Sequence, residues 1–435
     1  MLIAMSHIRP HDLPRHVAQT LHDAGVPAGA PLVAAVSGGS DSIALLAALA
    51  QHPDLQSTVS VGHVDHGLRP ESQREEAFVH QLCRSWSLPF HSTRLTLEPG
   101  APGNLADRLR TARYDYLLAL VPPGGFLLTA HHADDQAVTL LMRLIEGAAL
   151  PGLAGIPLRR QNIVRPLLDI PRRELRSFLR AQGIGWCEDS SNEKQNSYRN
   201  RVRTNIWSRC VEEAPLAPIH LSAVAQRLRE DNDAVQAWAN QLLASARGGV
   251  HWVEVELPTA AVPPAVLRRI LQTVLTRKWH TRPLSSVQWA ELQSQLYSGR
   301  RLNLPGRVTV HNKKNVLVFE HESEPETYRF EAARPGDYTV PTGRLRLGAA
   351  EFPVIVRSWR AGDRMTTGEK VPHWLARHGV PRYRRTGWPV ITQPGDERCA
   401  AQGDGIIAIA VPSTSPMSAQ AQHVFEDGLV ERFQG

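Results

Sequence analysis

Residues 32–50, LVAAVSGGSDSIALLAALA, predict a strand, a tight polar turn and a helix in direct succession. The apolar run from Leu32 to Val36 is short and does not alternate with polar residues, which is typical of a strand covered on both faces. The run from Ile43 to Ala50 contains no Gly or Pro and is rich in good helix formers. The stretch therefore indicates the first strand and helix of an α/β domain.

The turn in this stretch has the composition of a phosphate-binding loop. Gly38 and Gly39 allow the backbone to approach a ligand closely. Ser40, Asp41 and Ser42 open the helix, where free N–H groups and the helix dipole favour an anion. The turn lacks the Lys of a Walker A loop, which excludes that motif. The alternative is an ordinary strand–turn–helix unit with a polar turn.

Strand and helix patterns alternate up to about residue 150. Strands are expected at 32–36, 59–65 and 125–130, and helices at 41–51, 71–87, 104–120 and 134–146. This alternation implies βαβ units and a parallel sheet. Each strand is followed by a polar cluster, and the carboxyl ends of parallel strands lie at one edge of a sheet. We therefore expect the three clusters to share one site.

Two later boundaries divide the rest of the chain. Pro215 and Pro218 mark the first, and the charged, Pro-containing segment 322–326 marks the second. Helical spacing dominates between the boundaries, whereas short apolar runs and Gly or Pro turns follow residue 328. We expect a Rossmann-like parallel-sheet α/β domain at 1–215, a mainly helical domain at 216–325 and a small α+β domain at 328–435.

Composition narrows the class of protein. The chain has 435 residues, of which 42% are hydrophobic and 21% charged, as in globular proteins. No run of 18 apolar residues predicts a membrane span, and the N-terminus lacks the apolar segment of a signal peptide. The four cysteines are far apart, with no CxxC pair. We therefore expect a reduced, cytoplasmic protein.

Positive charge is concentrated in two segments. Residues 159–209 hold 12 Lys and Arg against 5 Asp and Glu, and residues 357–385 hold 8 against 2. Because the formal net charge of the chain is +7, the remainder is slightly acidic. Such segments indicate a polyanionic partner, most simply nucleic acid. The alternative for each is an Arg-rich helix face in contact with water.

Polar residues after the second and third strands suit nucleotide chemistry. His63 and Asp65 lie in HVDHGLRP, where imidazole and carboxylate groups can hold a ribose, an adenine edge or a metal ion. His131, Asp134 and Asp135 lie in TAHHADDQ, at a predicted helix start. Adjacent carboxylates there suit Mg²⁺, which ATP chemistry needs, or simply a helix cap. For the second cluster, HVDHGLRP, the alternative is a loop whose polar groups bond their own backbone.

Arginines form two further motifs. In NLADRLRTARYDYL (104–117), Arg108 and Arg113 lie on a predicted helix and can reach phosphates, or are simply exposed. After WCEDSSN, the run YRNRVR carries Arg199, Arg201 and Arg203. Guanidinium groups this close together form a compact cationic surface for phosphate oxygens.

The motifs occur in one order and together resemble the tRNA(Ile)-lysidine synthetase family of the ATP pyrophosphatases (PP-loop proteins). They are SGGSDS, HVDHGLRPES, NLADRLRTARYDYL, TAHHADDQ and WCEDSSNEKQNSYRNRVR. The resemblance is strongest over residues 32–210, and RPLL at 165–168 and GDR at 362–364 support it. Residues 215–325 resemble the corresponding part of the family only in being mainly helical.

The resemblance implies a two-step reaction. ATP would adenylate C2 of the wobble cytidine in an isoleucine tRNA with a CAU anticodon, releasing pyrophosphate. Free L-lysine would then displace AMP and leave lysidine. The implied cofactors are ATP and Mg²⁺, and the implied partners are this tRNA and lysine. No membrane partner is expected, and a homodimer is compatible with the resemblance.

The resemblance also distributes roles among residues. ATP would be bound by Ser37, Gly38, Gly39, Ser40, Asp41, Ser42, His63, Asp65 and His131. Lysine would be bound by Asp134 and Asp135, and Mg²⁺ by Asp41 and Asp135. The catalytic residues would be Asp41, Asp135, Arg199, Arg201 and Arg203. The tRNA would contact Arg108, Arg113, Arg360, Arg364, Arg384 and Arg385.

Two departures from the family pattern are visible. The acid usual two residues after the Gln of the third cluster is Val138 here, so lysine or metal binding would use another acid, for which Glu146 is a candidate. Residues 146–149 read Glu-Gly-Ala-Ala where Arg-Gly-x-Gly is common, which would alter a backbone contact to RNA.

Three rival functions compete with this interpretation. A sulfur-inserting tRNA thiolase with the same loop would need paired catalytic cysteines or an iron–sulfur set, which the cysteine spacing disfavours. A small-molecule ligase of the ATP pyrophosphatase type would not need the basic C-terminal segment. A non-catalytic tRNA-binding protein is supported only by Val138.

Overall fold

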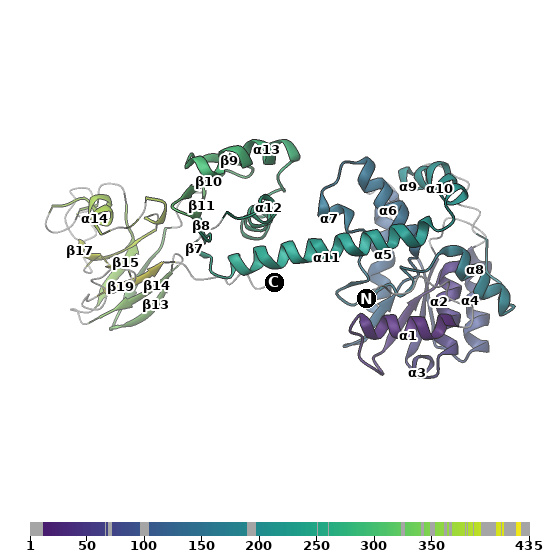
Figure 1. The fold of residues 1–435 in the computed structure, drawn as a ribbon. Coiled ribbons are helices and arrows are strands. Elements are labelled where there is room, and N and C mark those ends of the chain that lie inside the picture. The colour runs from purple at the N-terminus through teal and green to yellow at the C-terminus, as the bar shows by residue number, and fades with distance from the viewer. Residues whose placement is uncertain are drawn as a thin grey trace. The chain divides into compact units, whose positions relative to one another are not determined.

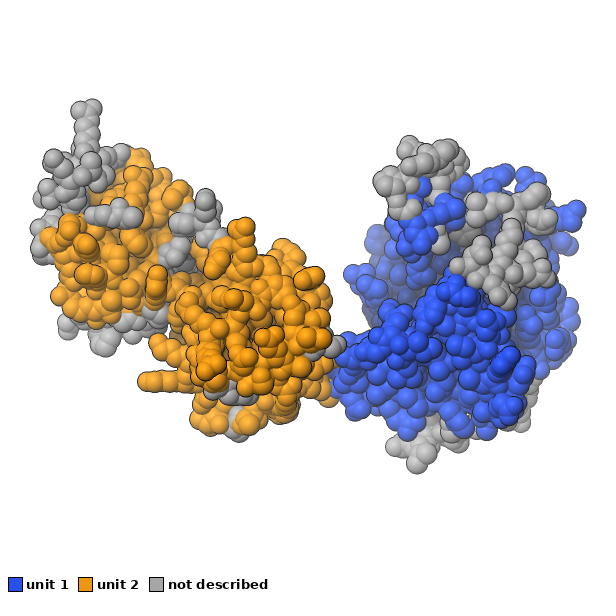
Figure 2. Space-filling view, turned by 90° about the horizontal axis from the view of Figure 1, so that it is seen from above, with its two compact units in different colours: residues 1–232 blue, residues 233–435 orange. Residues whose placement is uncertain are grey.

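The computed structural model describes residues 12–427, apart from 66, 68–71, 96–103, 189–196, 250, 260, 323–326, 341–342, 349–352, 361–362, 365–367, 379, 381, 386, 393–405, 410 and 413–422. The chain forms two compact units, Met1–Asn232 and Asp233–Gly435, coloured blue and orange in Figure 2. The boundary lies within one long helix, and the three-domain division stays a prediction.

The first unit is built on a six-stranded sheet in the order β3-β2-β1-β4-β6-β5, and the helices of this unit are labelled in Figure 1. Neighbouring strands are parallel except for β5, which pairs with β6 in the antiparallel sense. The strands are β1 (Leu32–Ala35), β2 (Val59–Asp65), β3 (Phe90–Arg94), β4 (Phe126–Leu128), β5 (Arg159–Arg160) and β6 (Ile163–Val164). The predicted parallel-sheet α/β fold is therefore confirmed.

Helices connect these strands and extend beyond them. They are α1 (Leu13–Asp23), α2 (Ser40–Gln51), α3 (Pro53–Gln56), α4 (Ser72–Ser85), α5 (Leu105–Ala119), α6 (Ala133–Ile145), α7 (Leu150–Leu153), α8 (Arg172–Ala181), α9 (Tyr198–Arg201), the π-helix η3 (Val202–Trp207), α10 (Ser208–Glu213) and α11 (Ala217–Leu243). Four of them match the predicted helices to within two residues at each end.

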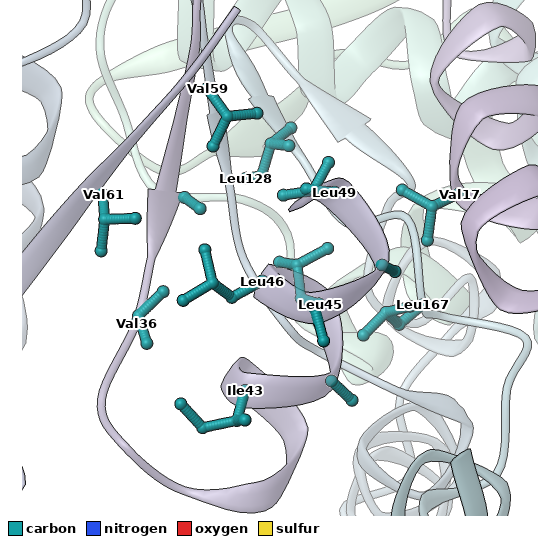
Figure 3. Packing of buried hydrophobic residues seen from close by; sticks show 14 of the residues in the cluster. Val17, Val36, Ile43, Leu45, Leu46, Leu49, Val59, Val61, Leu128 and Leu167 are labelled. Atoms are coloured by element: carbon teal, nitrogen blue, oxygen red, sulfur yellow. The ribbon is translucent and has the colours of Figure 1, made fainter. Parts of the chain in front are cut away.

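Helix α2 lies at the centre of the first unit's core. The side chains of Ile43, Leu45, Leu46 and Leu49 are completely buried, and they pack against strand residues such as Val61 (Figure 3). Contacts with α1 and α8 bury the other sides of α2. Because every residue from Ser42 to Leu49 is buried, the body of the helix is apolar on all sides, and its first turn is held at the sheet edge.

The second unit combines helices with antiparallel sheets. A five-stranded sheet comprises β7 (Arg247–Gly249), β8 (Trp252–Glu256), β11 (Val316–His321), β10 (Val308–Lys313) and β9 (Leu302–Leu304). It shares a core with α12 (Pro264–Thr273) and α13 (Ser286–Gln295). The region predicted to be mainly helical thus also contains a five-stranded sheet, whose β8 and β10–β11 hairpin have strand-like sequence patterns.

The C-terminal part of this unit is rich in strands, as predicted. One sheet is formed by β12 (Arg329–Ala332), β15 (Val354–Ser358), β16 (Pro389–Thr392) and β17 (Ile406–Ile409), and another by β13 (Gly336–Val340), β14 (Gly343–Leu347), β19 (His423–Asp427) and β18 (Val411–Pro412). Helix α14 (Val371–Arg377) packs with them. Among the described residues, no helix has the length and apolar character needed to cross a bilayer.

Candidate active site

The loop between β1 and α2 is shaped by glycine and by one serine hydroxyl. Gly38 has a φ of +94°, a conformation that residues with a Cβ rarely adopt. The hydroxyl of Ser42 donates to the carbonyl of Gly39 (3.0 Å) and accepts from the backbone N–H of Ser37 (3.2 Å). These bonds fold the chain tightly over the start of α2.

The first turn of α2 is open to an anion. Gly39 is the N-cap and has no side chain to bond the first N–H groups, which lack partners inside a helix. A Cβ placed on Gly39 would meet only the hydroxyl of Ser37, at 3.7 Å, so packing within the protein does not explain the glycine. The turn therefore leaves room beside the unpaired N–H groups at the start of α2, and phosphate binding there stays a prediction.

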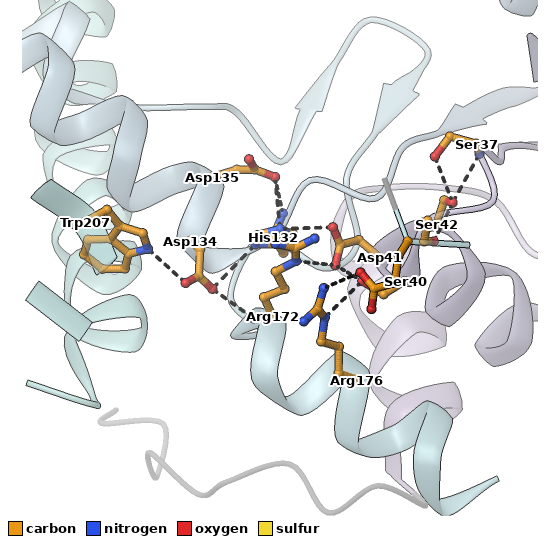
Figure 4. Close-up of polar contacts among 12 residues, drawn as sticks. Ser37, Ser40, Asp41, Ser42, His132, Asp134, Asp135, Arg172, Arg176 and Trp207 are labelled. Atoms are coloured by element: carbon orange, nitrogen blue, oxygen red, sulfur yellow. Dashed lines mark hydrogen bonds and ion pairs between the residues drawn. The ribbon is translucent and has the colours of Figure 1, made fainter. Parts of the chain in front are cut away.

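His132 gathers three carboxylates at the edge of this loop (Figure 4). Its Nε2 lies 3.5 Å from an Oδ2 of both Asp41 and Asp135, and its Nδ1 lies 3.6 Å from Oδ2 of Asp134. The imidazole is buried, with 2% of the side chain exposed. Residues from the first and third predicted clusters therefore do meet in one site.

This arrangement fixes the charge of the cluster. Burial alone would lower the pKa of His132, but Asp135, Asp134 and Asp41 raise it to about 10. Burial alone would raise the pKa of Asp41, yet His132 and Arg172 hold it far below its ordinary value. The pKa values of Asp134 and Asp135 are lowered in the same way, chiefly by His132. The cluster is therefore an imidazolium among three carboxylates at neutral pH.

Helix α8 and the segment after residue 198 hold the carboxylates in place. The Nε of Arg172 donates to Oδ1 of Asp41 (3.2 Å), and its backbone N–H donates to Oδ2 of Asp134 (2.9 Å). The indole of Trp207 donates to the other oxygen of Asp134 (2.9 Å). Both oxygens of Asp134 are thus occupied by rigid partners.

The three predicted arginines of the last motif do not behave alike. Arg199 donates to Oδ1 of Asp135 (3.1 Å) and to the hydroxyl of Thr139 (3.2 Å). Burial, with Arg172 nearby, lowers the pKa of Arg203, whose charge is felt by all three carboxylates. The guanidinium of Arg201 instead stands 5.9 Å over the ring of Tyr198. Arg199 and Arg203 therefore face the cluster, and Arg201 does not.

The predicted nucleoside-binding residues lie at neighbouring strand ends. His63 is buried, bonds the carbonyl of Val36 through Nδ1 (2.8 Å), and leaves Nε2 without a hydrogen-bond partner. Asp65 accepts from the N–H of Gly67 (2.7 Å), which closes the turn after β2. Burial lowers the pKa of His131 to about 4, so this imidazole is neutral.

Asp41 and Asp135, the predicted Mg²⁺ ligands, converge on one point beside His132. Mg²⁺ commonly takes one or two carboxylates and fills its remaining positions with phosphate oxygens and water. Within the described ranges, no group of three or more His, Cys, Asp or Glu side chains is arranged to hold a metal ion. A Mg²⁺ ion held by this pair would have to take its remaining ligands from phosphate and water.

Comparison with known proteins identifies the family. The family model described as a PP-loop domain matches residues 11–210. The tRNA(Ile)-lysidine synthase of Thermus thermophilus is 35% identical over 83% of this chain and 66% of its own length. That of Deinococcus deserti is 32% identical over 87% of this chain and 70% of its own length. The chain belongs to the tRNA(Ile)-lysidine synthase family.

The matched part spans slightly less than two thirds of the Thermus thermophilus relative. Among solved structures, a U34-tRNA thiolase from Methanococcus maripaludis has a TM-score of 0.43 and 18% identity, covering 51% of this chain and 78% of that one. It is only a distant relative.

The departure at Val138 from the pattern of the tRNA(Ile)-lysidine synthase family has a structural counterpart. Val138 is buried and packs with Val202 and Trp207 between α6 and η3. Glu146, the candidate replacement acid, lies just past the other end of α6, where it accepts from Arg143 (2.8 Å). Eleven residues of helix separate Glu146 from Asp135, or about 16 Å. Glu146 is therefore not part of the cluster.

The predicted tRNA contacts are spread over both units. Arg113 stacks over Tyr114, at 5.3 Å from the ring centroid, and burial lowers its pKa. Arg385 donates to the carbonyls of Val380 (2.9 Å) and Pro372 (3.1 Å), so two of its N–H groups are used in hydrogen bonds within the protein. Arg108 is half-buried, Arg360 and Arg364 are exposed, and the side chain of Arg384, like Gly362, lies outside the described part.

Several site residues were missed by sequence reasoning. The sequence pattern includes His132 in a motif without indicating its role, and it gives no signal for Arg172, Arg176 or Trp207. His132 carries a local signal, because it directly follows a strand and precedes the two acids. The other three reach the site only through tertiary packing of α8 and η3.

Proposed function

We propose that this chain is an ATP-dependent ligase that converts the wobble cytidine of tRNA(Ile) with a CAU anticodon into lysidine. The cytidine would be adenylated at C2 with release of pyrophosphate, and free L-lysine would then displace AMP. The observation that carries the proposal is the open N-terminus of α2 beside three carboxylates gathered on His132.

In the first step, the C2 oxygen of cytidine attacks the α-phosphorus, and the electron pair of the broken P–O bond leaves with pyrophosphate. Backbone N–H groups at Gly39–Ser42 stabilise the charge that develops on the phosphates. Arg199 and Arg203 face the same space and supply further positive charge. Bound Mg²⁺, held by Asp41 and Asp135, would offset phosphate charge.

In the second step, lysine must attack as a neutral amine, because the ammonium has no free electron pair. A carboxylate can bind the incoming ammonium group and accept its proton. Asp135 suits this role better than Asp134. Its partner Arg199 has 41% of its side chain exposed and can move aside, and the contacts of Asp135 with the N–H (3.3 Å) and Nε2 (3.5 Å) of His132 are long. Asp134 is held by two shorter bonds of 2.9 Å, from an indole and a backbone N–H.

Incorporation of labelled lysine tests the proposal. The chain is incubated with Mg²⁺, ATP, radioactive L-lysine and a transcript of tRNA(Ile) with a CAU anticodon. We expect one AMP and one pyrophosphate per lysine incorporated, and no incorporation into a transcript with uridine at the wobble position. Lysine transfer that is independent of ATP or of the wobble base would refute the proposal. A homodimer and a cytoplasmic location remain predictions.

A further inference from the structure

We propose that Arg176 forms a second cationic arm of the phosphate site and binds the terminal phosphates of ATP and the pyrophosphate that leaves. Two arginines on α8, one helical turn apart, reach the start of α2 (Figure 4). Arg172 donates to Asp41, and Nε of Arg176 lies 3.4 Å from the hydroxyl oxygen of Ser40. This inference rests on the proposed function, because it assumes that a triphosphate binds at this loop.

The guanidinium of Arg176 is held in position by a short segment that also contacts the loop, through its middle residue. The guanidinium of Arg176 stands 5.9 Å over the ring of Trp186, and its Nη2 lies 3.7 Å from Oε2 of Glu188. The indole of Trp186 in turn donates to Glu188 (2.9 Å). Between them, the backbone N–H of Cys187 donates to the carbonyl of Gly38 (3.0 Å). Segment 186–188 therefore fixes the arm relative to the glycine turn.

Charge distinguishes Arg176 from Arg172. Arg172 already pairs with the carboxylate of Asp41, whereas the loop partner of Arg176 is a neutral hydroxyl. The carboxylate of Glu188 is 73% exposed and more than 3.5 Å away, so it neutralises Arg176 weakly. Phosphate oxygens are stronger partners, because a guanidinium can donate two charge-assisted bonds to them. A cation there also stabilises the negative charge that develops on the departing pyrophosphate.

The test compares Arg176→Ala and Arg176→Lys with Arg180→Ala as a matched control. Arg180 lies one turn further along α8 and stands over the same Trp186 ring, at 6.0 Å. Binding of pyrophosphate with Mg²⁺ is measured by calorimetry, and melting temperatures confirm that each variant folds. We expect Arg176→Ala to weaken pyrophosphate binding about tenfold to a hundredfold. Arg180→Ala should leave it unchanged, and Arg176→Lys should restore part of the affinity.

Two results would overturn the inference. One is unchanged pyrophosphate affinity in Arg176→Ala. The other is an equal loss in Arg180→Ala, which would assign both arginines to the packing of Trp186. Lysine transfer by the unmodified chain is assayed in parallel. If lysine transfer fails while Arg176→Ala still weakens pyrophosphate binding, the proposed function is refuted and the role of Arg176 is supported. If lysine transfer occurs and the pyrophosphate affinity of Arg176→Ala does not change, only the proposed role of Arg176 is refuted.

Discussion

At the scale of single residues, His132 is the charge on which the cluster depends. Removing one partner from a buried ion pair leaves the other charges without compensation. We expect His132→Gln to lower the free energy of unfolding of the metal-free protein by about 3 kcal/mol near pH 6. Urea titration followed by circular dichroism measures this loss. A variant as stable as the unmodified chain would show that the carboxylates do not need the imidazolium.

The same histidine predicts how this loss depends on pH. Its pKa is raised from 6.5 to about 10, so its stabilising effect is complete below pH 6.5 and disappears as the pH rises towards 10. The lowered pKa values of Asp134 and Asp135 act in the opposite sense, and their contribution disappears as the pH falls through 3.8 and below. The stability difference from His132→Gln should therefore be largest between about pH 4 and 6.5. A difference that grows from pH 7 to 10 would contradict this account.

The two loop glycines should respond differently to substitution. Gly38→Ala forces a Cβ onto a φ of +94°, and we expect it to lower the stability of the fold by about 1 kcal/mol. Gly39→Ala meets no clash within the protein, so stability should be kept while ATP affinity falls at least tenfold. Thermal melting and ATP titration separate these effects. Full ATP affinity in Gly39→Ala would argue against phosphate binding there.

At the scale of elements, Val138 packs between two helices at the position where the family resemblance led us to expect an acid. It fills an apolar contact between α6 and η3, beside the Trp207 that holds Asp134. Restoring an acid with Val138→Glu would bury a charge among apolar side chains. We expect a loss of about 3 kcal/mol and weaker lysine binding, whereas Val138→Ile should cost less than about 1.5 kcal/mol. A stable Val138→Glu with tighter lysine binding would contradict this prediction.

Elements differ in how far their own sequence predicts them. Strand β1 and the part of helix α2 from Ile43 to Ala50 are apolar and were predicted closely, because burial of a whole segment leaves a clear apolar pattern. Strand β3 was missed because Phe90–Arg94 is largely polar and exposed at the sheet edge. Helix α1 was missed as well, although Leu13, Val17 and Leu21 recur at helical spacing and are buried.

At the scale of the whole molecule, the two basic segments should make tRNA binding depend on salt. Each phosphate contact releases bound counterions, so affinity falls as the salt concentration rises. With about six contacts we expect a slope near −5 in a log–log plot of affinity against salt. Filter binding between 50 and 200 mM salt measures the slope. Affinity that stays flat across this range would refute electrostatic binding.

The arginines of the second unit should contribute unequally to this slope. Arg360 and Arg364 are exposed, and their double alanine variant should reduce the slope by about two. Arg346 is also exposed but lies outside the basic segment, where it pairs with Asp337, and its alanine variant serves as the control. Equal slopes for the double variant and the unmodified chain would remove residues 357–385 from the proposed interface.

The site as a whole was predictable in its local parts and not in its long-range ones. The loop and the paired acids follow their strands directly, so the parallel-sheet rule brings them together. The arginines of α8 lie more than 130 residues from the loop that they contact. Likewise, adjacent arginines in the sequence do not reveal that Arg385 bonds backbone carbonyls. Such assignments require the folded chain.

The central claim is that ATP binds where β1 turns into α2. A crystal structure of the chain with ATP and Mg²⁺ tests it most directly. The account predicts density for the β- and γ-phosphates against the N–H groups of Gly39–Ser42, with the metal between Asp41 and Asp135. Density for the triphosphate elsewhere, with this turn empty at saturating ATP, would contradict the account.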